Sequence, residues 1–491
     1  MSTKRHTMYN LGGAVAPVAM MLLSVPLYLG LVGEARYGVL ALVWIVTGYF
    51  SFFDFGLGRA TAYAIARARD ESDDVRAQTF WTALIVNTGF GIAGGLIVLV
   101  AAPLVFNEVF NLTPELREEL RPVLPWLALA IPLLTFEGVF TGALTGREKF
   151  LLLNVRSIIG TAITQFLPLA FVWAIAPTLT VAIPATILAR TISVAILSVI
   201  AFRSVPAGFR PRFGGRAMVK ELLGYGGWVS LGSFLDPIVT NLDRFLIAAY
   251  LNVTAVSHYT VPFQLVTRGG LFSRALANAL FPRFARSSAA EVERIALLGI
   301  RANAALMTIL VVAGMMLMRP FLTIWIGSDF AEAAAPVGEQ LAISVWLTAI
   351  ALIPFNVVQA RGRPKEAVVA LVIQTIPFIA VAIPAVIHHG IIGMAVARNL
   401  RSLLNLIILS YRCGNLPKVA KIISVPMAIL FATSVSLHME FPSISIQLAV
   451  YSAIMAACIA FAFVIYPESK NLIRSALGKF SGHWISGGTR R

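Results

Sequence analysis

Long runs of apolar residues, separated by short polar segments, recur along the whole chain. Most runs reach about 20 residues, the length that an α-helix needs to cross the hydrocarbon core of a bilayer. The pattern predicts an all-α polytopic membrane protein with about 14 transmembrane helices, or about 12 if the weakest runs do not span. The predicted spans are 8–31, 38–66, 79–106, 123–145, 151–175, 180–202, 221–250, 256–282, 295–325, 337–360, 366–388, 392–410, 422–437 and 445–466.

The basic residues between these runs predict how the chain is oriented. When the gaps are assigned alternately to two sides, about 26 Lys and Arg residues fall on one side and only about 3 on the other. Those three are Arg36, Arg117 and Arg121. Because cytoplasmic loops accumulate Lys and Arg, we expect an inner-membrane-type protein with both termini in the cytoplasm. The first run, of about 24 residues, is too long for a signal peptide and predicts an uncleaved first span.

Composition supports the membrane interpretation. The chain is 58% hydrophobic and 13% charged, whereas a soluble domain carries about 25% charged residues. A net charge of +16 would indicate a nucleic-acid partner in a soluble protein, but the basic loops account for it here, so no nucleic acid is expected. The sequence contains no P-loop and no metal-ligand spacing around Cys413 or Cys458. We therefore expect no cofactor, no metal site and no ATP hydrolysis by a P-loop.

Two short similarities at one offset of six spans indicate an internal duplication. The segment Arg59–Ala66 resembles Arg274–Phe281, and Gly146–Lys149 resembles Gly362–Lys365. Six is an even number, so the two halves would share one orientation and be related by an axis along the membrane normal, with a cavity between them.

A Pro- and Gly-rich segment, 203–220, separates the two halves. The predicted organisation is an N-terminal six-helix lobe (1–205), a C-terminal six-helix lobe (206–420), and an extra helix pair with a basic cytoplasmic tail (421–491).

Charged residues inside the predicted spans need an explanation. An Arg at the centre of a span costs about 2.5–3.5 kcal/mol, so it faces protein or water. Near span ends, Arg156, Arg301 and Arg319 are expected to extend to the lipid headgroups. The full set comprises Arg59, Arg156, Arg190, Arg244, Arg268, Arg274, Arg301, Arg319, Arg398 and Arg401, against the acidic Asp54, Glu137, Asp236 and Asp243.

The surplus of arginines predicts a water-filled cationic cavity for an anionic cargo, such as a phosphate, a diphosphate or an acidic sugar. The candidate substrate-binding residues are the deeper ones: Arg59, Arg190, Arg268, Arg274 and Arg398.

The acidic residues are candidates for coupling transport to an ion gradient, because a proton-coupled carrier needs an acid whose pKa changes with the state of the cavity. Asp54 is the best placed, five residues before Arg59 on the same span, with Glu137, Asp236 and Asp243 as reserves. Two alternatives stay open. Asp54 could cap or pair locally, and Asp243 with Arg244 could form a structural ion pair.

The first two spans resemble those of a known family. The elements that carry the resemblance are Tyr9-Asn10-Leu11-Gly12, Val25-Pro26-Leu27-Tyr28, Tyr37-Gly38 and Phe53-Asp54-Phe55-Gly56-Leu57-Gly58-Arg59-Ala60. They are similar to the polysaccharide-transporter (O-antigen-type) flippases, whose superfamily also contains the lipid II flippase and the multidrug and toxin extrusion transporters. The match is specific over about the first 70 residues and rests beyond them on span count, repeat and basic loops.

The resemblance implies two six-helix lobes around a central cavity and alternating access. It implies that undecaprenyl-diphosphate-linked oligosaccharide moves from the cytoplasmic to the outer leaflet during biosynthesis of O-antigen, capsule or exopolysaccharide. A polysaccharide polymerase and a chain-length regulator would be the protein partners.

Three other functions stay open at this point. An ion-coupled multidrug antiporter of the same superfamily would favour acids and aromatics in its cavity rather than arginines. A membrane glycan polymerase or ligase would be expected to carry a large outer loop with catalytic residues, and the longest outer loop, 107–121, is short. A scaffold in a glycan-assembly complex would need no charged cavity.

Overall fold

The computed structural model describes residues 3–49, 56–68, 71–204, 211–224 and 227–465. These residues form helices joined by short connections and contain no strand, which confirms the predicted all-α class. Ten of the described helices are long and apolar enough to cross a membrane. The chain is therefore a multi-pass membrane protein.

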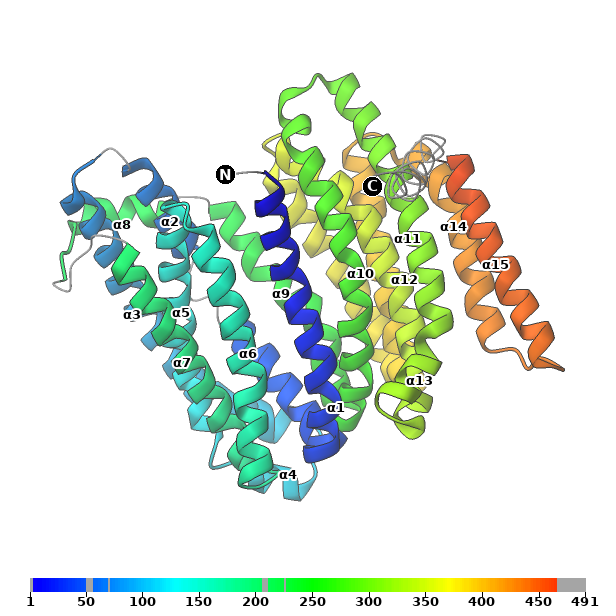
Figure 1. The fold of residues 1–491 in the computed structure, drawn as a ribbon, viewed down its shortest axis with the longest axis horizontal. Helices are drawn as coiled ribbons and strands as arrows, with labels where there is room; N and C mark the ends of the chain where they lie inside the picture. The colour runs from blue at the N-terminus through cyan, green and yellow to red at the C-terminus, as the bar shows by residue number, and fades with distance from the viewer. Residues whose placement is uncertain (1–2, 50–55, 69–70, 205–210, 225–226, 466–491) are drawn as a thin grey trace, which may run out of the picture. The chain divides into compact units, whose positions relative to one another are not determined.

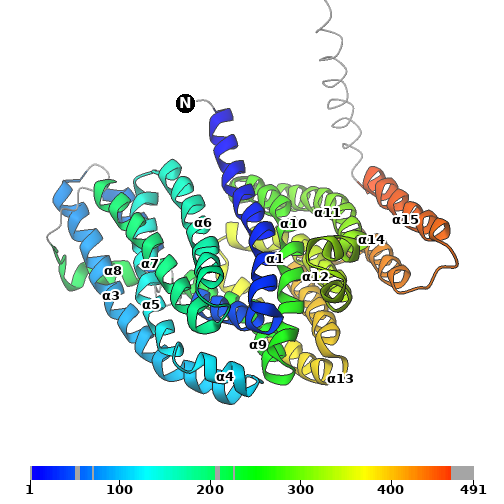
Figure 2. The same ribbon diagram turned by 60° about the horizontal axis from the view of Figure 1, so that its bottom comes forward.

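The helices divide into two compact units, Met1–Thr260 and Val261–Arg491, which we call the N-unit and the C-unit (Figures 1 and 2). The N-unit contains α1 (Thr3–Tyr49), α2 (Leu57–Arg67), α3 (Asp73–Leu104) with a π-helical turn (Val105–Val109), α4 (Pro114–Leu120), α5 (Leu124–Gly146), α6 (Phe150–Ala174), α7 (Leu179–Ser204), α8 (Gly215–Gly224), α9 (Gly227–Tyr250) and the start of α10 (Val253–Arg286). The C-unit contains the rest of α10, α11 (Ala289–Trp325), α12 (Ser328–Ala360), α13 (Pro364–Arg412), α14 (Leu416–Leu437) and α15 (Ile444–Ile465). The lobe boundary predicted near residue 206 concerns a repeat in sequence, and it stays a prediction.

Two helices continue past a glycine bend from one predicted span into the next. α13 covers 366–388 and 392–410, whereas α1 covers 8–31 and only the first part of 38–66, whose end lies in α2. The sequence predicts breaks at 31–38 and 388–392, and the backbone leaves the helical conformation at Gly33 (φ 79°, ψ 166°) and Gly390 (φ 58°, ψ −144°). Glycine adopts positive φ at no steric cost, so one residue is enough to separate two spans.

Aromatic rings and close helix contacts form the N-unit core. Phe80 of α3 packs against Phe140 of α5 and Phe202 of α7, with ring centroids 6.0 and 5.4 Å apart. α2 approaches α5 so closely that a Cβ added to Gly142 would lie 2.0 Å from the carbonyl oxygen of Gly58. Small residues at such crossings allow close van der Waals packing, which replaces the hydrophobic effect between helices in lipid.

The C-unit core lies between α11 and α12. The indole of Trp346 is fully buried there, and its Nε1 donates to the hydroxyl of Thr308 at 3.0 Å. The last two helices, α14 and α15, pack against α11 at the edge of this unit (Figure 1). They correspond to the helix pair predicted beyond the twelve core spans.

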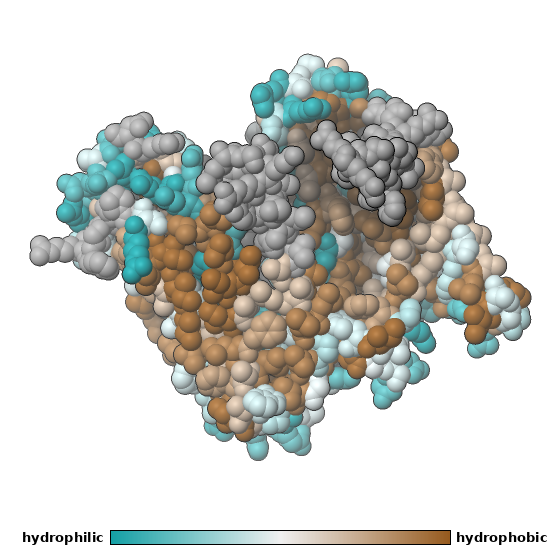
Figure 3. Space-filling view, viewed as in Figure 1, coloured by the Kyte–Doolittle hydropathy of each residue, from teal (hydrophilic) through white to brown (hydrophobic). Residues whose placement is uncertain are grey.

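The outer faces of the helices are apolar. Ile92, Leu96, Val100 and Leu104 follow one another at four-residue spacing on α3, and each is more than half exposed. Figure 3 shows such hydrophobic flanks in brown, with hydrophilic residues gathered toward the ends of the helices. This distribution is the one that a bilayer as solvent requires.

One turn geometry closes three helices. In each turn the sixth residue donates its N–H to the first carbonyl and the fifth donates to the second, with a positive φ at the fifth residue, which is the Schellman motif. The paired donors are Lys149 and Glu148 after α5, Arg363 and Gly362 after α12, and Asn415 and Gly414 after α13.

This geometry corrects the register of the sequence repeat. When the two segments are aligned by residue identity, Gly146 matches Gly362. By conformation, Glu148 (φ 57°) takes the place of Gly362 (φ 71°). Residue identity gives the wrong register because the turn requires a left-handed backbone conformation at one position, and glycine is the usual but not the obligatory residue there.

A buried cross-helix bond also recurs in both units. The side-chain amide of Asn87 on α3 donates to the carbonyl oxygen of Thr135 on α5 at 2.8 Å, and Asn303 on α11 donates to Ala349 on α12 at 2.6 Å. This parallel supports the duplication that the sequence predicts, which stays a prediction.

Candidate functional site

A polar cavity of about 180 Å³ lies in the N-unit between α1, α5, α6 and α7. We call it the N-unit polar pocket. It is lined by Trp44, Thr47, Ala130, Thr164, Gln165, Thr186, Ile187 and Arg190. Thr164 and Arg190 lie near the middle of α6 and α7. The pocket is therefore a polar site at the depth where a membrane helix is normally apolar.

Arg190 is the predicted substrate-binding residue that this pocket contains. Its side chain is half-buried, and among the residues that the structure describes it forms no hydrogen bond or ion pair. The Glu137 carboxylate acts on this guanidinium only through space, without a hydrogen bond or ion pair. The donors of this mid-span guanidinium are therefore available for an anionic ligand.

Aromatic residues of α1 position Trp44 beside Arg190. The rings of Tyr28 and Tyr37 meet the indole edge-on, with centroids 5.6 and 5.8 Å away. The Tyr28 hydroxyl donates to the backbone carbonyl of Gln165 at 3.0 Å, which ties α1 to α6. These contacts hold the wall of the pocket without a ligand.

Glu137 and Arg156 form an ion pair between α5 and α6. The Nη1 atom of Arg156 lies 2.6 Å from a Glu137 carboxylate oxygen, and its Nη2 donates to the Ser193 hydroxyl of α7 at 3.1 Å. The prediction that Arg156 extends to the headgroups is wrong, because a carboxylate on the neighbouring helix is a better partner than the interface. Glu137, a candidate coupling acid, is thus engaged with an arginine.

Asp243, another candidate acid, lies in a separate cluster. It is fully buried on α9 and accepts a hydrogen bond from the Tyr259 hydroxyl at 2.7 Å. The guanidinium of Arg244 lies 3.9 Å away. This arrangement fits the alternative that Asp243 and Arg244 form a structural ion pair, which the sequence analysis left open.

The remaining predicted residues are distributed over other elements. Arg59 is exposed in the first turn of α2. On α10, Arg268 is half-buried and Arg274 is exposed, and the two like charges lie close enough to repel each other. Asp54 lies outside the described residues, and the side chain of Asp236 lies outside the described side chains.

Two arginines of α13 are buried against aromatic rings of the C-unit. Arg398 lies 4.3 Å from the centroid of the Phe263 ring, and Arg401 lies 5.1 Å from that of Phe378. Cation–π contacts of this kind stabilise a guanidinium in an apolar environment while leaving its edge able to donate. Arg401, which the sequence did not single out as a binding residue, is as buried as Arg398.

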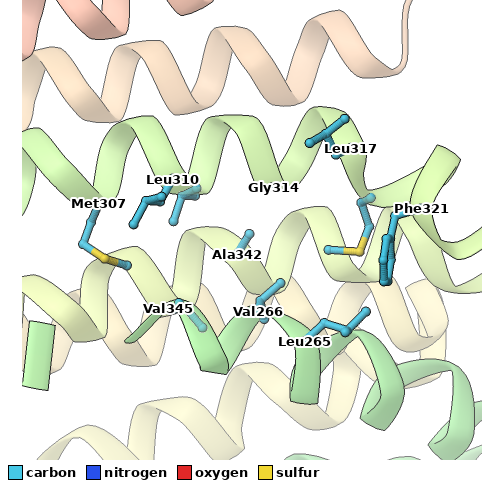
Figure 4. Close-up of a pocket in the computed structure, with 12 residues that line it drawn as sticks. Leu265, Val266, Met307, Leu310, Gly314, Leu317, Phe321, Ala342 and Val345 are labelled. Carbon is cyan, nitrogen blue, oxygen red and sulfur yellow. The ribbon is translucent and has the colours of Figure 1, made fainter. Parts of the chain in front are cut away.

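The C-unit also has a cavity of about 240 Å³ between α10, α11 and α12 (Figure 4). Its lining consists of glycine and apolar side chains, among them Leu265, Met307 and Phe321, and includes none of the predicted arginines. Such a lining can accept a hydrocarbon group but offers nothing to an anion.

A polar cluster on α12 was missed by the sequence argument. Glu339 is 5% exposed and lies 4.0 Å from the imidazole of His438. Its neighbour Gln340 bonds Ser434 at 2.9 Å and Asn399 at 3.3 Å. The sequence did contain a signal for this cluster, since Glu339 is an acidic residue inside the predicted span 337–360. This additional negative charge reduces the surplus of arginines from which the cationic cavity was inferred.

The chain is similar in sequence to a known transporter and similar in fold to several solved structures. The chain is 24% identical over 417 residues to the "Putative O-antigen transporter" of Shigella flexneri, covering 84% of this chain and 97% of the relative. In fold it is similar to the lipid II flippase MurJ in an inward closed conformation (TM-score 0.68, 13% identity, 95% of this chain and 99% of that chain). It is also similar to an inward-facing MATE family transporter of the MOP superfamily (TM-score 0.65, 14% identity, 82% and 99%).

The fold is therefore that of a multi-pass helical membrane protein of the MurJ and MATE type. The family described as "Polysaccharide biosynthesis protein" matches residues 4–288, more than half of the chain, and the chain belongs to this family. The resemblance drawn from the first two spans is thereby confirmed.

Proposed function

We propose that this protein is a flippase that moves undecaprenyl-diphosphate-linked oligosaccharide from the cytoplasmic to the outer leaflet of the bacterial inner membrane by alternating access. Both termini would face the cytoplasm. The observation that carries the proposal is Arg190, a mid-span guanidinium that forms no hydrogen bond or ion pair among the described residues, in a polar pocket of a polysaccharide-biosynthesis family member. Arg59, Arg268, Arg274 and Arg398 are the other proposed substrate-binding residues for the anionic cargo.

The experiment is transport by the purified protein in proteoliposomes. A fluorescent undecaprenyl-diphosphate-linked oligosaccharide on one leaflet should reach the other when wild-type protein is present. The double variant Arg59→Ala/Arg274→Ala should transport at least about tenfold more slowly, because charge-assisted hydrogen bonds to the cargo are lost. The matched control is Arg301→Ala, an exposed arginine near a predicted span end, which should transport like wild type. Wild-type rates from the double variant would refute the assignment of these arginines.

A multidrug antiporter is the second candidate, because the fold is shared with a MATE family transporter. Exchange of a cationic drug for an ion, with no lipid transfer, would favour it. The arginine in the N-unit polar pocket argues against it, since a cationic drug would be repelled there.

Coupling to an ion gradient remains a proposal for Asp54, Glu137, Asp236 and Asp243. An imposed pH gradient in the same proteoliposomes tests each acid. If Asp54→Asn keeps the gradient dependence of wild type, Asp54 has a local structural role.

A further inference from the structure

The polar side chains that line the N-unit polar pocket can be assigned as hydrogen-bond acceptors or donors. The hydroxyls of Thr47, Thr164 and Thr186 donate to the carbonyls four residues before them, at 2.8, 2.9 and 2.8 Å. Each hydroxyl proton is thereby committed to the helix backbone. The three oxygens can therefore only accept from a ligand.

The same pocket also contains hydrogen-bond donors. The Oε1 atom of Gln165 accepts from the Ser24 hydroxyl at 3.0 Å, so the amide nitrogen is left to donate. Arg190 adds its guanidinium donors. The pocket thus combines three acceptors, one amide donor, one guanidinium and the indole of Trp44.

We propose that the N-unit polar pocket binds one acidic sugar ring of the transported glycan. Arg190 and Gln165 would hold its carboxylate, the three threonine oxygens would accept from its hydroxyls, and Trp44 would contact an apolar face of the ring. The inference rests on the proposed flippase function and narrows its cargo to glycans that contain a uronic acid or a similar sugar.

The chemistry of the pocket separates this ligand from the diphosphate of the same cargo. An ionised diphosphate presents only acceptors, so the three threonine oxygens would face it without a donor. A sugar acid presents both hydroxyl donors and a carboxylate. The volume, about 180 Å³, suits one sugar ring and not an oligosaccharide.

The proposal is tested by binding to the full-length protein in lipid nanodiscs, observed by saturation-transfer NMR. The probes are methyl glucuronide, methyl galacturonide and methyl glucoside, with inorganic diphosphate as competitor. At least one uronide should bind about tenfold or more tightly than the glucoside, since the pair of a guanidinium with a carboxylate is lost in the neutral sugar. Diphosphate should not displace the uronide.

Three variants locate the binding site. Arg190→Ala should reduce uronide binding to the level of the glucoside, and Thr164→Val, which keeps the shape and removes one acceptor, should weaken it about fivefold. The control is Thr88→Val, whose hydroxyl makes the same backbone bond to Leu84 on α3 but lies outside the pocket. It should bind like wild type.

The proposal is overturned if neither uronide binds, if glucoside binds equally well, if diphosphate displaces the uronide, or if Arg190→Ala binds normally. Its failure is distinguishable from failure of the proposed function. Lipid transfer without uronide binding would refute only the proposal that the pocket binds an acidic sugar. Arg190-dependent uronide binding without lipid transfer would refute only the proposed flippase function.

Discussion

The guanidinium of Arg156 is held by groups from two other helices, a carboxylate on α5 and a hydroxyl on α7. Its side chain is only 11% exposed and that of Glu137 is 27% exposed. Removing one partner leaves the other charged inside a membrane-spanning segment, whereas removing both leaves no charge behind. At the scale of residues, this pair is a structural element of the N-unit.

A double-mutant cycle measures this pair. Glu137→Gln and Arg156→Gln should each destabilise the protein, and the double variant should be less destabilised than the sum by about 1–3 kcal/mol. Unfolding in detergent gives the free energies. The comparison pair is Arg294 with Glu291, exposed on one helix, where the effects of the two substitutions should add because solvent screens the pair. Additive effects at Glu137 and Arg156 would contradict an energetically coupled, partly buried pair.

Single residues also show how far the sequence alone could lead. It identified Arg190, because a charge in an apolar run stands out. It did not identify Trp44, Thr47, Thr164 or Gln165, since such residues are common in membrane helices and only packing brings them around one cavity. Arg156 was misassigned for the same reason, because its position along its own helix says nothing about the acid on the next one.

At the scale of elements, the turn after α5 places a glutamate where the corresponding turn after α12 has a glycine. A side chain with positive φ costs roughly 1–2 kcal/mol. We therefore expect Gly362→Ala to destabilise the protein by about this amount, and Glu148→Gly to be neutral or stabilising. Thermal unfolding of the two variants in detergent measures the difference. Equal losses of stability in both variants would show that the side chain of Glu148 contributes more than its backbone costs.

The short helix α4 is fastened by one carboxylate. Glu119 accepts from Nε of Arg36 at 3.0 Å and from the backbone N–H of Leu179 at 3.1 Å. Burial alone would raise the pKa of Glu119, but these two donors bind its charged form, and the pKa lies below its ordinary value.

A lowered pKa gives this contact a defined pH dependence. The stabilisation is complete above the ordinary carboxyl pKa of about 4.3 and is lost as the pH falls through the lower folded value. Glu119→Gln should be less stable than wild type by about 1 kcal/mol at pH 7, and the difference should narrow below pH 4. Unfolding at several pH values tests this, and a difference that grows in acid would exclude the assignment.

The elements themselves were largely predictable from sequence. Apolar length set the spans, and the polar gaps at 31–38 and 388–392 located the bends at Gly33 and Gly390. The register of the turn after α5 was not predictable, since the residue with positive φ is Glu148 and a glutamate in the sequence does not indicate a left-handed backbone conformation.

At the scale of the whole molecule, the basic loops predict the orientation in the membrane. A cysteine at Arg117 should react from outside intact cells with an impermeant maleimide, and one at Arg286 only after the membrane is opened. The native thiols interfere little, because Cys458 is fully buried and burial raises the pKa of Cys413 to about 11. The reverse pattern of labelling would overturn the orientation.

The repeat belongs to the same scale. The parallel bonds of Asn87 and Asn303 support the predicted duplication. A serine also occupies the N-cap position of both α3 and α11 (Ser72 and Ser288), although only the Ser288 side chain accepts a capping hydrogen bond. Arg59 lies 13 residues before Ser72 and Arg274 lies 14 before Ser288. Their equivalence stays a prediction.

The bends at Gly33 and Gly390 also bear on how this chain can change during evolution. Where one glycine separates two spans, no spare loop can absorb a residue gained or lost. A single insertion there would turn the following helix by about 100° and move it by about 1.5 Å, so that its lipid-facing side would rotate into the protein. Homologous chains should therefore vary in length around 203–220 and hardly at all around Gly33 and Gly390, and an alignment with frequent gaps at either glycine would show that these bends are not fixed points of the architecture.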